Sequence, residues 1–219
     1  MSHPTVHAIF PIPIYTATCN IDVSSAVEFL NRNHSLIPND HADQYGNKTV
    51  DDYILENPEC QALKNFILQH IEQYASSIMA WDFEHFQVTQ SWVTIKQPGE
   101  QHGPHYHPNS VLSAVFFFQD DIAEVEPLQF HRLEIISQLM NQFAPAVSNE
   151  KKQHTEFPWH TWSVSPKKNT LVIFPSWLNH SVSTNITTSP RKSLAVNAIP
   201  TNKFGSRMSS AELDFSRLK

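Results

Sequence analysis

The chain has 219 residues, a length typical of one domain with a sizeable hydrophobic core. Its 15 Lys+Arg against 21 Asp+Glu give a net charge of -6, and the basic residues form no cluster, which argues against nucleic acid as a general partner. It contains only 4 glycines, and neither G-x-G-x-x-G nor G-x-x-x-x-G-K-[ST] occurs. Rossmann and P-loop nucleotide-binding folds are therefore excluded.

Cysteine usage and the N-terminal residues predict the cellular location of the protein. Cys19 and Cys60 lie far apart and in no C-x-x-C spacing, so we expect buried thiols and neither a disulfide nor a zinc site. The opening MSHPTVHAIFPIPIY has no basic start, and prolines interrupt its apolar residues, so we expect no signal peptide. We therefore expect a cytoplasmic protein outside the membrane. The sequence leaves its oligomeric state open, with a homodimer as one arrangement.

The first part of the chain, residues 1–85, carries two helical patterns after a short extended opening. Residues 24–33 (SSAVEFLNRN) have an apolar side that predicts a short helix. A second helix is predicted from Asn57, where Asn, Pro58 and Glu59 form a start signal, and apolar residues continue at helical spacing to Ile78. No repeat or linker divides the sequence, so we expect a single domain over residues 1–219.

After about residue 86 the pattern changes to short apolar runs rich in β-branched and aromatic residues. The runs are FQVTQSWVTI, SVLSAVFFF, HTWSVS, NTLVIFPSW, HSVSTNIT and RKSLAVNAI. They predict an antiparallel sandwich or barrel over residues 86–200, with the N-terminal helices packed outside it. An insert near residues 122–158 contains LEIISQLMNQF, which fits a helix, and its length makes it a candidate lid.

A group of histidines lies in GEQHGPHYHPNSVLS. Alternate residues of an extended strand point to the same side, so His105 and His107 can present two imidazoles to one point while Tyr106 points away. Neutral imidazole is the commonest metal ligand among side chains. His180, which follows the apolar run TLVIFPSW, is the candidate third ligand. Taken alone, each is equally an ordinary loop histidine, and His102 stays unassigned beside them.

Arg191 lies 11 residues after His180 in RKSLAVN, and Ser193 faces the same side of the predicted strand. The planar fork of arginine suits a carboxylate, and the serine adds a hydroxyl beside it. A surface ion pair is the alternative interpretation of Arg191 alone. Together with the histidines, these residues predict an anion site one strand away from a metal.

These motifs, taken together, resemble the iron(II)- and 2-oxoglutarate-dependent oxygenases. Three segments carry the similarity: QSWVTIKQPGEQHGPHYHPNSVLSAVFFF, LVIFPSWLNHSV and RKSLAVN. It is strongest with a group of bacterial and phage members. The segment IFPIPIY near the start of this chain also resembles the start of those proteins. The resemblance extends over nearly the whole chain. It implies a mainly β fold with flanking α, a double-stranded β-helix or jelly roll, with Fe(II) at one mouth, 2-oxoglutarate as cosubstrate and O2 as oxidant.

The resemblance also implies roles for single residues. His105 and His180 match metal ligands, and Arg191 with Ser193 matches the group that binds the distal carboxylate of 2-oxoglutarate. Three further residues match motif positions that shape the pocket or contact the cosubstrate: Asn109, Ser113 and Asn197.

His107 departs from the pattern of most of the superfamily, which has Asp or Glu at this position. The usual set of two histidines and one carboxylate would become three histidines. Fe(II) with three neutral imidazoles and dianionic 2-oxoglutarate is neutral overall, so cosubstrate binding should survive, and the same set also suits zinc. A carboxylate from Asp120 or Asp121 is a second option, although both follow a long strand that ends away from the histidines.

We therefore predict an Fe(II)- and 2-oxoglutarate-dependent dioxygenase that hydroxylates an unidentified small molecule or peptide. Two other functions stay open: a cupin-like metalloenzyme that uses the three histidines without 2-oxoglutarate, and a non-enzymatic jelly-roll binding protein. The candidate substrate contacts, each otherwise a packing aromatic, are Trp92, Tyr106, Trp159, Trp162 and Trp177.

Overall fold

The computed structural model describes residues 10–39, 45–119, 127–133, 160–165, 167–205, 207–209 and 212–217. Most of the predicted insert, including nearly all of LEIISQLMNQF, lies outside the described residues, as do Asp120, Asp121 and Trp159. None of the described helices is long and apolar enough to cross a membrane.

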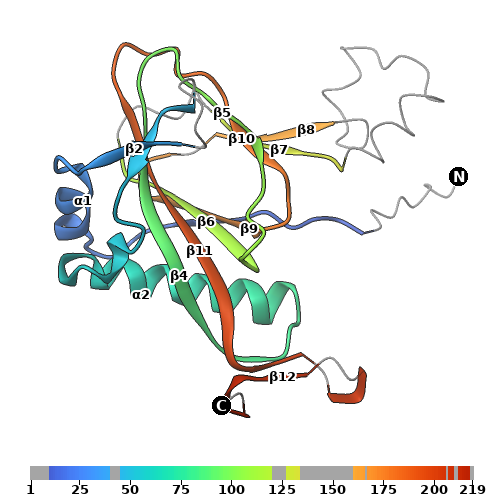
Figure 1. Ribbon diagram of the computed structural model, residues 1–219. Helices are drawn as coiled ribbons and strands as arrows, with labels where there is room; N and C mark the ends of the chain where they lie inside the picture. The colour runs from blue at the N-terminus through green and yellow to red at the C-terminus, as the bar shows by residue number, and fades with distance from the viewer. Residues whose placement is uncertain are drawn as a thin grey trace, which may run out of the picture.

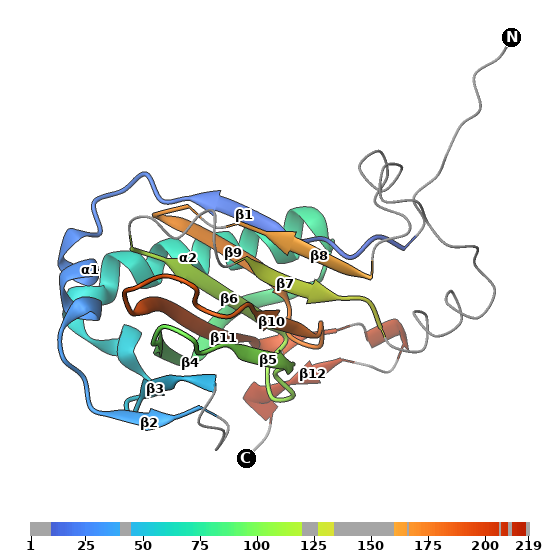
Figure 2. The ribbon, with the colours of Figure 1, turned by 90° about the horizontal axis from the view of Figure 1, so that it is seen from above.

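Two antiparallel sheets face each other in the described part of the chain, and Figures 1 and 2 show α2 on the opposite face of the larger sheet. The larger sheet runs β1 (Tyr15–Thr18), β9 (Thr170–Pro175), β6 (Leu112–Phe117), β11 (Arg191–Phe204), β4 (Phe83–Lys96), β3 (Asn47–Thr49) and β2 (Leu36–Pro38), with β12 (Leu213–Asp214) beside β11. The smaller sheet runs β5 (His102–His105), β10 (His180–Val182), β7 (Leu128–His131) and β8 (Thr161–Val164). This is the predicted double-stranded β-helix with helices outside it.

The two helices form where the apolar spacing predicts them. Helix α1 covers Ser24–Asn31, and α2 covers Gln61–Gln73 between a 3-10 turn at 58–60 and a π-helical turn at 74–78. The side chain of Asn57 accepts a hydrogen bond from the backbone N–H of Glu59 at 3.0 Å, as the start signal predicts. The irregular first and last turns complete the predicted span of residues 58–78.

Alternation along the strands divides the apolar residues between two cores. On β9, Leu171 and Ile173 pack in the core beneath the helices, whereas Val172 and Phe174 pack in a second core between the two sheets. Strands β4 and β11, each 14 residues long, alternate in the same way. Their residues that face the smaller sheet line a pocket between the sheets: Trp92, Thr94, Lys96, Ser193 and Ala195.

Leu194 tests the helix-side core, because it is fully buried on β11 between β4 and β6. We expect Leu194→Ala to lower the free energy of unfolding by about 2–5 kcal/mol, since it removes packing atoms and leaves a cavity. Leu213→Ala, at an exposed position of β12, should cost less than about 0.5 kcal/mol. Denaturant titration measures both variants, and equal losses would contradict this description of the core.

Candidate metal centre

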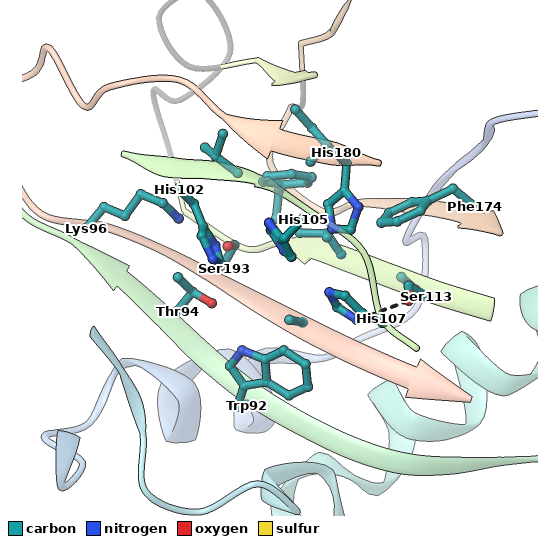
Figure 3. Close-up of a pocket in the computed structure, with 16 residues that line it drawn as sticks. Trp92, Thr94, Lys96, His102, His105, His107, Ser113, Phe174, His180 and Ser193 are labelled. Atoms are coloured by element: carbon teal, nitrogen blue, oxygen red, sulfur yellow. Dashed lines mark hydrogen bonds between the residues drawn. The ribbon is translucent and has the colours of Figure 1, made fainter. Parts of the chain in front are cut away.

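Three histidines, two from the smaller sheet and one just after β5, converge on one point of the pocket (Figure 3). His105 ends β5, and His180 begins β10 directly opposite it. One ring nitrogen from each of His105, His107 and His180 lies within 4.8 Å of the other two. The structure thus brings together the three histidines that the sequence singles out.

The path of the chain at His107 differs from the prediction. The strand ends at His105, so His105 and His107 do not share one extended strand. Pro108 follows and cannot donate a backbone hydrogen bond, and residues 108–109 form a turn. The backbone N–H of His107 instead donates to the carbonyl oxygen of Ser176 at 2.9 Å, which places His107 beside the turn that leads to His180.

Backbone carbonyls orient two of the three rings. Nδ1 of His105 lies 2.8 Å from the carbonyl oxygen of Gly103, and Nδ1 of His180 lies 2.9 Å from that of Leu178. Because a carbonyl oxygen only accepts, each ring donates through Nδ1–H and keeps its Nε2 lone pair for a ligand. Two imidazoles that direct Nε2 rather than Nδ1 into one pocket suit a first-row metal ion.

Burial also keeps His180 uncharged. Its side chain is almost fully buried, and loss of hydration lowers its pKa well below the ordinary histidine value, with His105 and His107 adding to the shift. A histidine must be neutral to bind a metal, so His180 is ready to do so at neutral pH.

The side chain of His107 meets two residues that the sequence predicts to bind the cosubstrate. Nδ1 of His107 is within hydrogen-bond distance of Oδ1 of Asn197 and lies 3.2 Å from Oγ of Ser113. Asn197 and Ser113 therefore contact the histidine itself. Asn109 lies in the exposed turn after His107 and is not among the residues that line the pocket.

Cationic side chains gather where β4 and β11 pair. The register places Arg191 opposite Lys96 and Ser193 opposite Thr94. Lys96, Thr94 and Ser193 line the pocket with the histidines, and Lys96 is only 3% exposed. Arg191 is buried next to them, with its guanidinium carbon 5.5 Å from the ring centroid of Phe117, itself a lining residue. Buried cations beside hydroxyls suit a carboxylate.

Sequence reasoning missed Lys96 and Thr94. Their alternation with Trp92 places all three on one side of β4, and this signal was present in the sequence. That this side of β4 lies beside Arg191 and Ser193 depends on the pairing of β4 with β11, and residue spacing does not predict that pairing. His102, unassigned from the sequence, also lines the pocket and stacks on His105 with ring centroids 4.0 Å apart.

The predicted aromatic contacts separate into two groups. Trp92 lines the pocket, with its ring centroid 5.8 Å from that of His107. The other described candidates are exposed and do not line it: Tyr106, Trp162 and Trp177.

A comparison with family models matches residues 90–197 to the family described as "Putative 2OG-Fe(II) oxygenase". These residues belong to the 2OG-Fe(II) oxygenase family. The matched range runs from β4 to β11 and contains the three histidines, Lys96 and Arg191. The protein is thus an oxidoreductase of the iron- and 2-oxoglutarate-dependent kind, as the motifs predict. No curated protein matches the chain in sequence.

Solved structures share the fold of this oxygenase. The α-ketoglutarate-dependent epimerase SnoN of nogalamycin biosynthesis is 12% identical, with a TM-score of 0.60 over 89% of this chain and 82% of that one. A prolyl-4-hydroxylase from Pseudomonas putida is 15% identical, with a TM-score of 0.55 over 85% and 92%. HygX from Streptomyces hygroscopicus, solved with nickel, 2-oxoglutarate and hygromycin B, is 10% identical, with a TM-score of 0.56 over 87% and 84%. At these identities the likeness shows the fold alone.

The depressed pKa of His180 predicts how the metal-free protein responds to acid. Below about pH 6.5 His180 is protonated in the unfolded chain but stays neutral in the folded one. The free energy of unfolding therefore falls by up to about 1.4 kcal/mol per pH unit as the pH decreases. Burial lowers the pKa of His70 and His131 as well, and both act in the same direction. Thermal melts between about pH 7.5 and about pH 5 should show a shallower loss for His180→Gln than for the wild type. An identical slope would contradict the buried, neutral ring.

Proposed function

We propose that this oxygenase hydroxylates a small molecule or an accessible peptide side chain, with His105, His107 and His180 as the ligands of Fe(II). The observation that carries the proposal is the pocket itself, which has three converging imidazoles and, on β4 and β11, buried cations. Iron bound with 2-oxoglutarate supplies the oxidising power, because decarboxylation of the cosubstrate to succinate is coupled to oxidation of the substrate by O2.

Charge supports a ligand set of three histidines. Among the described residues, the group that could hold a metal contains no carboxylate. Three neutral imidazoles leave the two positive charges of Fe(II) uncompensated, and dianionic 2-oxoglutarate would offset part of the positive charge of the pocket. Binding of the cosubstrate would therefore lower the positive charge of the pocket, which favours loading of metal and cosubstrate together.

The cationic side of the pocket would hold the distal carboxylate of the cosubstrate. Lys96 and Ser193 line the pocket directly, and Thr94 lies between Lys96 and Trp92 on the same face of β4. We assign the direct charged contact to Lys96 and a supporting charge to the buried Arg191 beside it. Burial strengthens the attraction, since little water screens the charges.

Apolar side chains lining the same pocket suit the carbon skeleton of a small substrate: Val115, Phe117, Leu128, Phe174 and Val182. Figure 3 shows Trp92 on the side of His107 away from His180, where its ring can flank a substrate that approaches the metal.

Consumption of 2-oxoglutarate tests the function directly. Protein purified without chelator and given Fe(II) and O2 should form succinate from 2-oxoglutarate, slowly even without a substrate. His105→Ala and His180→Ala should bind less than a tenth of the metal and form no succinate above background. Metal binding without use of 2-oxoglutarate would favour a cupin-like metalloenzyme. Absence of both would favour a binding protein.

Lys96→Met tests the assignment of the carboxylate site. Removal of a buried cation that pairs with an anion costs about 2–5 kcal/mol, so the Kd of 2-oxoglutarate should rise at least about tenfold while the metal still binds. Lys192→Met is the matched control, because Lys192 is adjacent to Arg191 on β11 but reaches the carbonyl oxygen of Asn31. Calorimetric titration of the Mn(II)-loaded protein measures both variants. A tenfold effect of Lys192→Met, or none of Lys96→Met, would contradict the assignment.

A further inference from the structure

The third histidine of the candidate centre is held differently from the other two. Backbone carbonyls orient His105 and His180, and no side-chain substitution removes them. His107 is oriented by the side chains of Asn197 and Ser113. We propose that Asn197 is a positioning residue that holds the His107 ring as its Nδ1–H tautomer and so makes a neutral imidazole the third metal ligand. This inference rests on the metal site of the proposed function.

The contacts of Asn197 set the direction of its amide group. Nδ2 of Asn197 donates to Oε1 of Gln90 at 3.4 Å, which leaves Oδ1 facing Nδ1 of His107. Oγ of Ser113 donates to the same Oδ1 at 3.1 Å and lies 2.8 Å from Oγ of Ser176. The contacts with Gln90 and with Ser113 thus both favour the orientation in which Oδ1 of Asn197 faces His107.

This orientation decides where the ring carries its proton. Oδ1 of an amide only accepts hydrogen bonds, so a neutral ring must donate through Nδ1–H and carry its lone pair on Nε2. The opposite tautomer would place the lone pairs of Nδ1 and Oδ1 against each other. Leaving these buried groups without their hydrogen bond costs about 1–3 kcal/mol.

The surroundings protect this hydrogen bond from water. Asn197, Ser113 and Ser176 are all buried, so water does not compete for the amide oxygen. The pairing of β4 with β11 also shifts register between Asn197 and Ala198, and Thr89 donates through Oγ1 to the backbone carbonyl of Asn197 at 3.2 Å. Such bulges redirect a side chain locally, and this one lies at the residue that faces His107.

Nitrogen NMR of the metal-free protein tests the tautomer without reference to activity. With 15N-labelled histidine, the ring that disappears in His107→Gln should show a protonated Nδ1 and an unprotonated Nε2. In Asn197→Leu that ring should lose this preference, and in Asn197→Asp, which keeps an acceptor, it should retain it. A protonated Nε2 in the wild type, or no change in Asn197→Leu, would overturn the proposal.

Metal affinity gives the second test, with Co(II) as a spectroscopic probe. Asn197→Leu should weaken Co(II) binding about 10–100-fold, and Asn197→Asp should stay within about threefold of the wild type. Thr89→Val, which removes a contact to the backbone of Asn197 only, is the matched control and should leave affinity unchanged. If Asn197→Leu does not fold, as judged by circular dichroism, Asn197→Ala provides the same comparison.

The two proposals fail in different ways. Wild-type affinity in a folded Asn197→Leu protein would overturn the role of Asn197 while leaving the oxygenase assignment intact. A wild type that binds Co(II) but consumes no 2-oxoglutarate would overturn the proposed function, and the ring tautomer would still decide the role of Asn197.

Discussion

The antiparallel pairing of β4 with β11 is the constraint on which the rest of the structure depends. The two strands pair from Arg191 and Lys96 at one end to Phe204 and Phe83 at the other. Alternate residues face the helices and the pocket, so this one register assigns the helix-side core and the polar lining together. A slip by one residue would bury Lys96 and Ser193 under the helices. Burial of the apolar side of β4 and β11 under the helices therefore fixes which residues of these strands line the pocket.

The pocket places an uncharged imidazole near basic side chains. Burial favours neutral imidazole at His180, whereas Lys96 and Arg191 are buried as cations. A buried cation is costly unless an anion compensates it. A molecule with carboxylates at both ends would suit this arrangement, with one carboxylate toward the histidines and the other toward the basic side chains. The difference between the two groups of side chains would thereby orient the cosubstrate.

Local patterns in the sequence were enough to predict the helix that starts at Asn57, the histidines, and the strands β4, β6, β8, β9, β10 and β11, but not the short strands β2, β3, β7 and β12. Composition and residue spacing predict these features because helices, strands and short motifs are formed by residues close together in the sequence. Lys96 was missed because its role depends on a partner strand nearly 100 residues away, as Arg191 opposite Lys96 shows. Asn197 was predicted to lie at the site, yet its contact with His107 joins positions that are 90 residues apart. Strand β5 ends at His105, three residues before the turn at Pro108, a local turn signal that the strand prediction did not use.

The position of β5 at the edge of the smaller sheet has a mechanical consequence. This strand is four residues long, includes Pro104, and pairs with β10 only at His105 and His102, with an irregularity between them. An ion shared by His105 and His180 would fasten this weak edge to its neighbour, much as a disulfide does. Binding of the ion would then make this wall of the pocket more rigid, and a chelator would make the same wall less rigid.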